Sequence, residues 1–326
     1  MDCIYKLSII ELIRIDNSTQ LNYNKHKFKN SLGGIYNMSK VKLTMLNSMG
    51  DSDFVKTLDK HKEWNIKAMD LKDCIFGKSL IGLTDEEAAS AHELINQKNM
   101  TVYCFSTVLF HLNIEIGEDE FRKQSLDKVD RVIEIARIMK PEVIRLLAAT
   151  STKRSEYSNI IPYIKTYTPW IIPLYREAVE KIHNAGFGVT IENEAHDCIF
   201  SNPEEILEFF NELNCKDKVS FTYDIQNLWQ MGTFPTVESY KKLSPITGYF
   251  HLKGGRSDGS RELVWKSSLE DASWPVSEIV ELAIKEKIST YFCINPSHGK
   301  SQEGYANHNI TQRDIEFLRK NFEGIE

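Results

Sequence analysis

The 326-residue sequence has few of the features that mark membrane, secreted or zinc-knuckle proteins. No run approaches the roughly 18 apolar residues that a membrane-spanning helix needs. The opening segment MDCIYKLSIIELIRIDNST has a short apolar patch, but acidic residues interrupt it and no small-residue cleavage site follows, so we do not expect a signal peptide. The six cysteines are scattered without a CxxC pair, which argues against a disulfide framework and a zinc knuckle and favours a reducing cytoplasm.

The sequence also has no excess of positive charge. It holds 40 Lys and Arg against 46 Asp and Glu, for a formal net charge of −6. A general nucleic-acid binder needs a basic stripe to displace counterions, so neither nucleic acid nor a membrane is an expected partner. The hydrophobic share of 41% and charged share of 26% are those of an ordinary globular protein, which favours a small-molecule partner.

From Lys42 onward, short apolar runs alternate with longer amphipathic ones. The runs predict eight strands, at Lys42–Leu46, Ile66–Asp70, Thr101–Phe105, Val143–Leu147, Gly188–Glu192, Val219–Asp224, Gly248–Leu252 and Thr290–Ile294. The amphipathic segments predict helices at Ser52–Glu63, Asp85–Gln97, Asp119–Met139, Pro169–Asn184, Pro203–Leu213, Thr236–Leu243, Pro275–Glu286 and Thr311–Asn321. Helix starts are marked by a capping box from Thr84 to Glu87 and by proline in the first turn at Pro203.

Eight strand–helix units over roughly 280 residues predict an α/β protein, a (β/α)8 TIM barrel. A doubly wound open sheet is the alternative, but the first turn, NSMGDSD, lacks the Gly-rich phosphate loop that usually accompanies that fold. We therefore predict a single-domain barrel over residues 41–326. Residues 1–40 are polar, lack periodicity and are predicted to form a loosely ordered N-terminal extension, with Met38 as an alternative natural start.

Catalytic groups of such barrels lie at the carboxyl ends of the strands. Polar residues gather at the ends of the last four predicted strands: Glu192, Glu194, Asp224, Asn227, His251, Lys253, Arg256, Asn295 and His298. Two carboxylates and an imidazole at three successive strand ends are able to share one divalent cation, such as Mn²⁺, Mg²⁺, Co²⁺ or Zn²⁺. An acid that closes a strand is as often only a loop or helix cap, and a lone His251 is more often a core residue.

The segments VTIENE, FTYDIQN and GYFHLKGG resemble the sugar phosphate isomerase/epimerase family, the xylose-isomerase-like TIM barrels. The resemblance covers about residues 40–322 and implies Glu192, Asp224 and His251 as metal ligands. It also implies substrate contacts for Asn227, at the position of a frequent histidine, and for Arg256, near a substrate-binding arginine. Asn295 departs from the pattern because the family has a glutamate there. An asparagine supplies a carbonyl oxygen but does not shuttle protons.

The resemblance implies an isomerase or epimerase acting on a sugar or cyclitol through α-proton abstraction and an enediolate. We expect Glu192 as the base, with Glu194 second, and Lys253 to polarise a carbonyl or donate a proton. Asn295 and His298 are expected to contact the substrate; for His298 the alternative is a surface loop role. The alternative functions are a related lyase or dehydratase, and a sugar-binding barrel that has lost its chemistry. A homo-oligomer is expected by family analogy alone.

Overall fold

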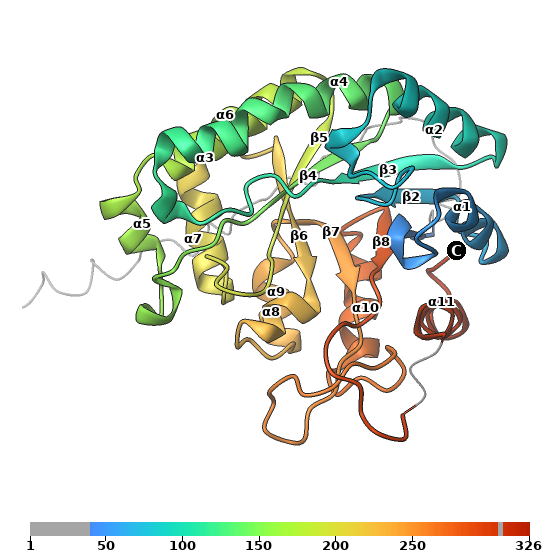
Figure 1. Cartoon of the computed structure of the whole chain (residues 1–326). Coiled ribbons are helices and arrows are strands. Elements are labelled where there is room, and N and C mark those ends of the chain that lie inside the picture. The colour runs from blue at the N-terminus through green and yellow to red at the C-terminus, as the bar shows by residue number, and fades with distance from the viewer. Residues whose placement is uncertain (1–39, 306–308) are drawn as a thin grey trace, which may run out of the picture. The chain divides into compact units, whose positions relative to one another are not determined.

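The computed structural model describes residues 40–305 and 309–326, which form a closed barrel of eight parallel strands arranged in chain order (Figure 1). The strands are β1 Lys42–Leu46, β2 Ala68–Leu71, β3 Thr101–Ser106, β4 Val143–Leu147, β5 Gly188–Glu192, β6 Val219–Asp224, β7 Thr247–Leu252 and β8 Tyr291–Ile294. Pairing of β8 with β1 closes the sheet. The predicted (β/α)8 barrel is therefore confirmed. Apart from Lys40, the predicted extension lies outside the described residues, and so does Met38.

Helices connect the strands and cover the outside of the barrel (Figure 1). Their bounds are α1 Phe54–Glu63, α2 Asp85–Gln97, α3 Glu118–Gln124, α4 Val129–Met139, α5 Ile161–Tyr167, α6 Ile171–Asn184, α7 Pro203–Leu213, α8 Ile225–Gln230, α9 Val237–Leu243, α10 Val276–Glu286 and α11 Ile310–Asn321. The capping box at α2 is present in full: Glu87 donates its amide to Thr84 Oγ1 at 3.2 Å, and Thr84 donates its amide to Glu87 Oε2 at 2.8 Å.

The single helix predicted over Asp119–Met139 is wrong in one respect, because the structure breaks it at Ser125 into α3 and α4. The Ser125 hydroxyl is buried and accepts the amide of Phe110 at 3.0 Å. A serine that hydrogen-bonds to neighbouring backbone competes with a continuous helix. The apolar residues at helical spacing after the break, Leu126, Val129, Ile133 and Ala136, are all buried.

Two short helices were not predicted, α5 and α8. The start of α8 is set by Asp224, the last residue of β6, whose Oδ1 accepts the amides of Gln226 at 3.1 Å and Asn227 at 2.9 Å. A carboxylate that accepts the first free amides of a helix satisfies donors that have no partner inside the helix. The strand end and the helix start therefore share one side chain.

The barrel interior is filled with side chains rather than open. A buried cluster within it comprises Leu46, Ala68, Tyr103, Cys104, Tyr249, Tyr291 and Cys293. Tyr249 shares a hydrogen bond with Thr44 across the interior, and its ring lies edge-on to the imidazole of His251 at 4.9 Å between centroids. This packed layer forms a floor beneath the carboxyl ends of the strands, as is usual in barrels of this kind.

Two further properties concern the described residues only. None of their helices is long and apolar enough to cross a membrane. The five cysteines among them, Cys74, Cys104, Cys198, Cys215 and Cys293, are all free thiols.

Candidate functional site

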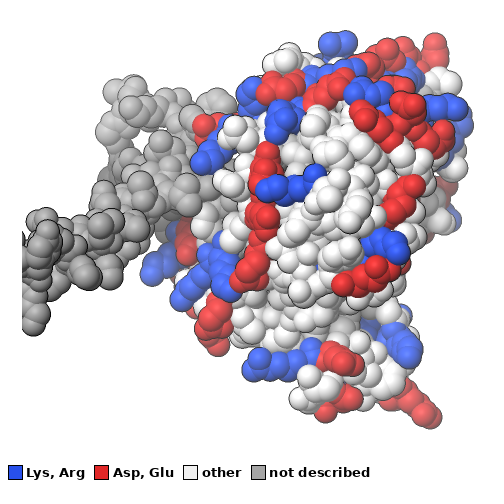
Figure 2. Space-filling model, turned by 90° about the vertical axis from the view of Figure 1, so that its left-hand side faces the viewer, with Lys and Arg blue, Asp and Glu red and all other residues white. Residues whose placement is uncertain are grey.

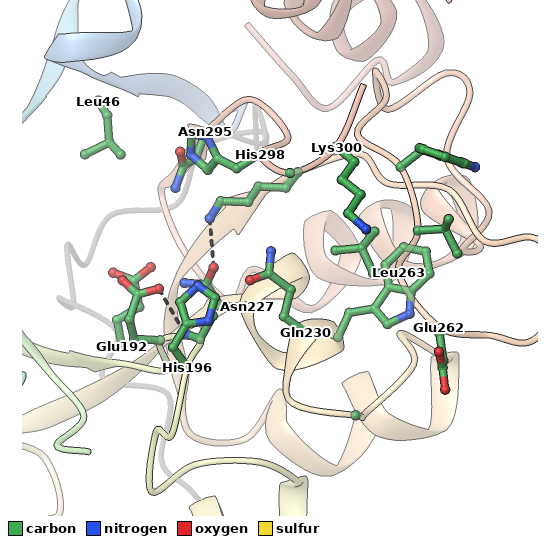
Figure 3. A pocket seen from close by; sticks show the side chains of 18 of the residues that line it. Leu46, Glu192, His196, Asn227, Gln230, Glu262, Leu263, Asn295, His298 and Lys300 are labelled. Carbon is green, nitrogen blue, oxygen red and sulfur yellow. Dashed lines mark hydrogen bonds between the residues drawn. The ribbon is translucent and has the colours of Figure 1, made fainter. Parts of the chain in front are cut away.

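A cavity of about 1030 Å³ lies at the carboxyl ends of the strands (Figure 3). Residues at or just beyond several strand ends line it, among them Leu46, Lys72, Glu192, Lys253 and Asn295. The loop after β7 and the loop after β8 form one of its walls, and they are joined because Lys266 donates its amide to the carbonyl of Lys300 at 2.9 Å. The cavity is therefore where the fold concentrates polar side chains.

Three of the predicted residues meet at the base of this cavity. Glu192 ends β5, Asp224 ends β6 and His251 lies in β7, and one ligand atom from each falls within 4.8 Å of the others. All three are buried. His251 Nδ1 lies 2.9 Å from Glu192 Oε1 and 3.6 Å from Asp224 Oδ2. The geometry brings together the carboxylates and the imidazole that the sequence singled out.

The chemistry of these donors fits a divalent cation. Although His251 Nδ1 is close to Glu192, neither ring nitrogen makes a well-formed hydrogen bond with a described residue. Such an arrangement suits atoms that point at a shared ion rather than at one another. Asn295 follows β8 with its Nδ2 3.4 Å from Asp224 Oδ2, and its buried Oδ1 accepts no hydrogen bond from a described residue. Two carboxylates, an imidazole and an amide oxygen form a ligand set typical of Mg²⁺, Mn²⁺ or Zn²⁺.

Two buried cations flank the same carboxylates. Arg145, in β4, pairs with Glu192 Oε2, and Lys253 Nζ lies 2.8 Å from Asp224 Oδ2. Lys253 also donates to Asn227 Oδ1 at 3.0 Å (Figure 3). Buried charges are tolerated when they are paired in this way, because each partner replaces the lost hydration of the other. The cations hold the carboxylates in a fixed orientation.

The shifts in pKa follow from these contacts. Burial opposes ionisation of Asp224, but the ammonium of Lys253 and the imidazole of His251 outweigh it and lower the pKa of this carboxyl. Burial also disfavours the charged form of Arg145, yet the Glu192 and Asp70 carboxylates raise the pKa of its guanidinium. For His251 the carboxylates again overcome burial and raise the pKa well above its ordinary value. The site therefore favours positive charge at the centre of its carboxylates.

A third carboxylate lies below the ligand set. Asp70, in β2, is fully buried, and its Oδ2 lies 3.6 Å from His251 Nε2. The same oxygen accepts the hydroxyl of Tyr249 at 3.0 Å. His251 thus has a carboxylate on each side of its ring, with Glu192 and Asp224 facing Nδ1 and Asp70 facing Nε2.

The other predicted residues are divided between the cavity and its surroundings. Glu194, Asn227, Asn295 and His298 line the cavity, and Figure 3 shows Asn295 and His298 across it from Glu192. Arg256 is not among the lining residues, and its guanidinium instead lies over the ring of Tyr305 at 5.7 Å.

Tryptophan residues lie both in the cavity lining and in the packed interior. Trp229 and Trp265 line the cavity, whereas Trp274 is buried and donates its indole N–H to the carbonyl of Lys253 at 3.2 Å. Gly254 follows Lys253 and comes close to other backbone, because a Cβ there would lie 2.1 Å from the carbonyl oxygen of Ser267. Trp274 and Gly254 thus fix the backbone that carries Lys253.

Sequence reasoning alone did not assign roles to Arg145 and Asp70. Both are charged residues within otherwise apolar strands, VIRLL and AMDL. A charge inside a buried strand needs a partner, and this signal was available in the sequence to identify them. The partner itself comes from another strand, so it emerges only from the barrel geometry.

A family model described as xylose isomerase-like TIM barrel matches residues 58–321 of the sequence. The chain belongs to this family. No curated protein sequence matches it. This xylose isomerase-like barrel is similar in fold to many solved structures, at low sequence identity.

Three of those structures illustrate the range of the fold. A xylose isomerase-like TIM barrel protein from Mycobacterium smegmatis in complex with magnesium has a TM-score of 0.64 at 15% identity, over 86% of this chain and 96% of that one. The probable 3-DHS dehydratase AsbF from Bacillus anthracis has a TM-score of 0.63 at 15% identity, over 85% and 98%. The 3-keto-D-glucoside 4-epimerase YcjR from E. coli has a TM-score of 0.61 at 12% identity, over 86% and 100%. At these identities the likeness shows the fold alone.

Proposed function

We propose that this protein is a metal-dependent enzyme that removes a proton next to the carbonyl of a sugar or cyclitol. The observation that carries the proposal is the convergence of Glu192, Asp224 and His251 on one point at the base of a polar cavity. These residues, with Asn295 Oδ1, would hold the cation. When bound, a divalent cation would polarise the carbonyl and stabilise the negative charge of an enediolate.

The proton acceptor has to be a carboxylate that faces the cavity. Glu192 is our first expectation from sequence, but Arg145 pairs with its Oε2 and His251 lies beside its Oε1. Glu194 also lines the cavity, and only its Oε1 accepts a hydrogen bond, from Ala195 at 2.9 Å. Its other oxygen is free among the described residues. We therefore assign the base role to Glu194 and the ligand role to Glu192.

At the end of β8, Asn295 occupies the position where the family resemblance implies a second carboxylate. Lys253 is the proton donor nearest the ligand set, since its Nζ contacts both Asp224 and Asn227. An ammonium is able to protonate an enediolate or a departing hydroxyl. His298 is not the proton donor near neutral pH. Burial and the charge of Lys253 lower its pKa to about 4, so its imidazole is already deprotonated there.

These roles support one first step and two outcomes. Reprotonation of the neighbouring carbon gives an isomer or epimer, which is the activity that the family resemblance implies. Loss of a β-hydroxyl, assisted by Lys253, gives a dehydratase, and the absence of a carboxylate at residue 295 favours this second candidate. Fold similarity to both an epimerase and a dehydratase is compatible with either.

The test is solvent deuterium exchange at the α-carbon, followed by NMR over a panel of keto-polyols with and without Mn²⁺. We expect exchange that depends on the metal and is lost in Glu194→Gln. Water elimination in the same spectra would identify the dehydratase. A protein that binds metal but exchanges no substrate proton would overturn the proposal and favour a sugar-binding barrel.

Elemental analysis of purified protein and its variants measures metal content, and so tests the ligand set independently of turnover. We expect stoichiometric metal in the wild type and in Glu194→Gln, and loss of metal in Glu192→Gln. Metal retained in Glu192→Gln, or absent from the wild type, would remove the assigned ligand set. Cytoplasmic location and a homo-oligomeric state stay predictions.

A further inference from the structure

The cavity is more basic than the protein as a whole. Its lining includes five basic side chains, from Lys72, Arg145, Lys253, Arg261 and Lys300, against three acidic ones, from Glu192, Glu194 and Glu262. With Asp224 at the base of the cavity included, the formal charge is +1, whereas that of the chain is −6. On the face drawn in Figure 2, by contrast, basic and acidic side chains are interspersed without a continuous basic stripe.

Four of these five basic side chains fall into two groups, and the fifth, Arg261, has its guanidinium over the ring of Phe234. Arg145 and Lys253 are buried and held by the carboxylates of Glu192 and Asp224. Lys72 and Lys300 lie nearer to solvent, and neither forms an ion pair within the described ranges 40–305 and 309–326. Their charges are consequently available to a ligand.

Lys72 and Lys300 reach the cavity from loops that follow two different strands. Lys72 follows β2 and Lys300 follows β8, and these strands are the two neighbours of β1 in the barrel. Asn47 Oδ1 accepts the amide of Lys72 at 2.9 Å, and the carbonyl of Lys300 accepts the amide of Lys266, also at 2.9 Å. Lys72 therefore lines the cavity beside the end of β2, and Lys300 lines the wall formed by the loops after β7 and β8, near Leu263 (Figure 3).

The pKa of His298 reflects the charges of several lysines around the cavity. His298 lines the cavity and donates its amide to Gln226 Oε1 at 3.0 Å. Burial, and then the charges of Lys253, Lys72 and Lys266, lower the pKa of its imidazole. His298 is thus a neutral hydrogen-bonding group close to several ammonium groups. Such a set is suited to an oxyanion, whose charge the lysines balance.

We propose that the ligand of this cavity is an anionic polyol, whose carboxylate or phosphate group is balanced by the charges of Lys72 and Lys300. The hydroxylated part of the ligand then extends toward Lys253 and the buried ligand set. That this ligand is also the substrate rests on the proposed function. The chain lacks a Gly-rich phosphate loop, so the carboxylate is the first expectation.

The test compares three six-carbon polyols by isothermal titration calorimetry on the full chain: sorbitol, gluconate and sorbitol 6-phosphate. Metal is removed with a chelator so that gluconate cannot gain affinity by binding a cation. We expect at least one anion to bind about tenfold more tightly than sorbitol, the effect of a single charge-assisted contact. The two anions distinguish a carboxylate from a phosphate. Equal affinities for all three, or no binding by any of them, would overturn the proposal.

The double variant Lys72→Gln/Lys300→Gln removes both ammonium charges and tests whether these two lysines bind the anion. We expect it to abolish the preference for the anion while leaving the affinity for sorbitol unchanged. Lys285→Gln, at an exposed position of α10, is the matched control and should keep the preference. An anion preference that survives in the double variant would overturn the assignment to these two residues.

The binding measurement needs neither turnover nor metal, so its failure differs from failure of the proposed function. Anion preference without deuterium exchange on any keto-polyol would remove the enzymatic proposal and leave this one. Deuterium exchange on neutral ketoses without any preference for an anion would remove the anion-binding proposal and leave the enzymatic one.

Discussion

His251 Nε2 lies 3.6 Å from Asp70 Oδ2, on the side of the ring away from Glu192 and Asp224. A carboxylate behind a ligating imidazole fixes the ring orientation and raises its basicity. We expect Asp70→Asn to weaken Mn²⁺ binding by about 10–100-fold, the range usual for loss of such a partner. Calorimetry measures it, with Tyr249→Phe as a milder variant that removes one hydrogen bond to Asp70 but keeps its charge. Unchanged affinity in Asp70→Asn would contradict a positioning role.

Asn295→Glu should strengthen metal binding. The change adds a charged oxygen donor where a neutral, unpartnered amide oxygen now lies near Asp224. Hard divalent cations prefer such ligands, so we expect about a tenfold gain in Mn²⁺ affinity. If the substitution also supplies a second proton carrier, deuterium exchange should appear on both faces of the substrate. Weaker Mn²⁺ binding in this variant would show that residue 295 lies outside the ligand set.

Gly254→Ala should destabilise the fold near Lys253. A Cβ at this position would lie 2.1 Å from the Ser267 carbonyl oxygen and 2.6 Å from that of Ser268, both rigid backbone atoms. We expect a loss of about 1–3 kcal/mol in chemical denaturation, as for other overpacked positions. Gly82→Ala is the control, because its nearest contact is a Ser79 side-chain oxygen at 3.4 Å. Equal stability of the two variants would contradict the close backbone approach.

Glu205→Gln tests a buried ion pair away from the cavity. Glu205 accepts Arg154 Nη1 at 2.7 Å and the amides of Ile160 at 2.8 Å and Ser201 at 2.9 Å. Removing its charge leaves Arg154 unpaired, and we expect a loss of about 3–5 kcal/mol in unfolding free energy. Its neighbour Glu204 pairs with Lys242 at the surface, so Glu204→Gln should change stability by less than about 1 kcal/mol. Similar effects in both variants would be evidence against the burial argument.

Asp314 should make stability fall as pH rises. Burial raises the pKa of this carboxyl from 3.8 to about 8, although the amide of Leu269, which Oδ1 accepts at 2.7 Å, favours the ionised form. Because the folded-state pKa is the higher one, the ionised carboxyl carries no penalty below pH 4; the penalty grows between about pH 4 and pH 8 and reaches about 6 kcal/mol at most. Asp314→Asn should therefore raise the melting temperature more at pH 8 than at pH 5. A difference independent of pH would contradict the shift.

Much of the fold could be predicted from the sequence, because strand and helix periods are local properties. Four of the eight predicted strands have the observed bounds, including β5 and β6, and the capping box at Thr84 marks the observed start of α2. The break at Ser125 could not be predicted, since it depends on the amide of Phe110 from another segment. Helix α8 was missed because Asp224 was interpreted as the end of a strand and a ligand, without its second role.

The candidate site could be predicted in part. The strand-end rule identified Glu192, Asp224 and His251, which the barrel brings together at its base. It assigned no role to Arg145 and Asp70. Arg145 pairs with Glu192 on the neighbouring strand β5, and Asp70 faces His251 of β7 across the barrel, so both contacts depend on how the strands align in the barrel. The position of Arg256 over Tyr305 depends on how the long loops after β7 and β8 pack, which periodicity does not determine.

Asp224 uses Oδ1 to cap α8 and turns Oδ2 toward Lys253 and His251. An ion bound by Asp224 Oδ2 would shift the carboxylate and so change the hydrogen bonds that Oδ1 accepts at the first turn of the helix. The amide protons of Gln226 and Asn227 are therefore built-in reporters: their NMR shifts and exchange rates should follow occupancy of the neighbouring centre, even for a silent ion that absorbs no visible light.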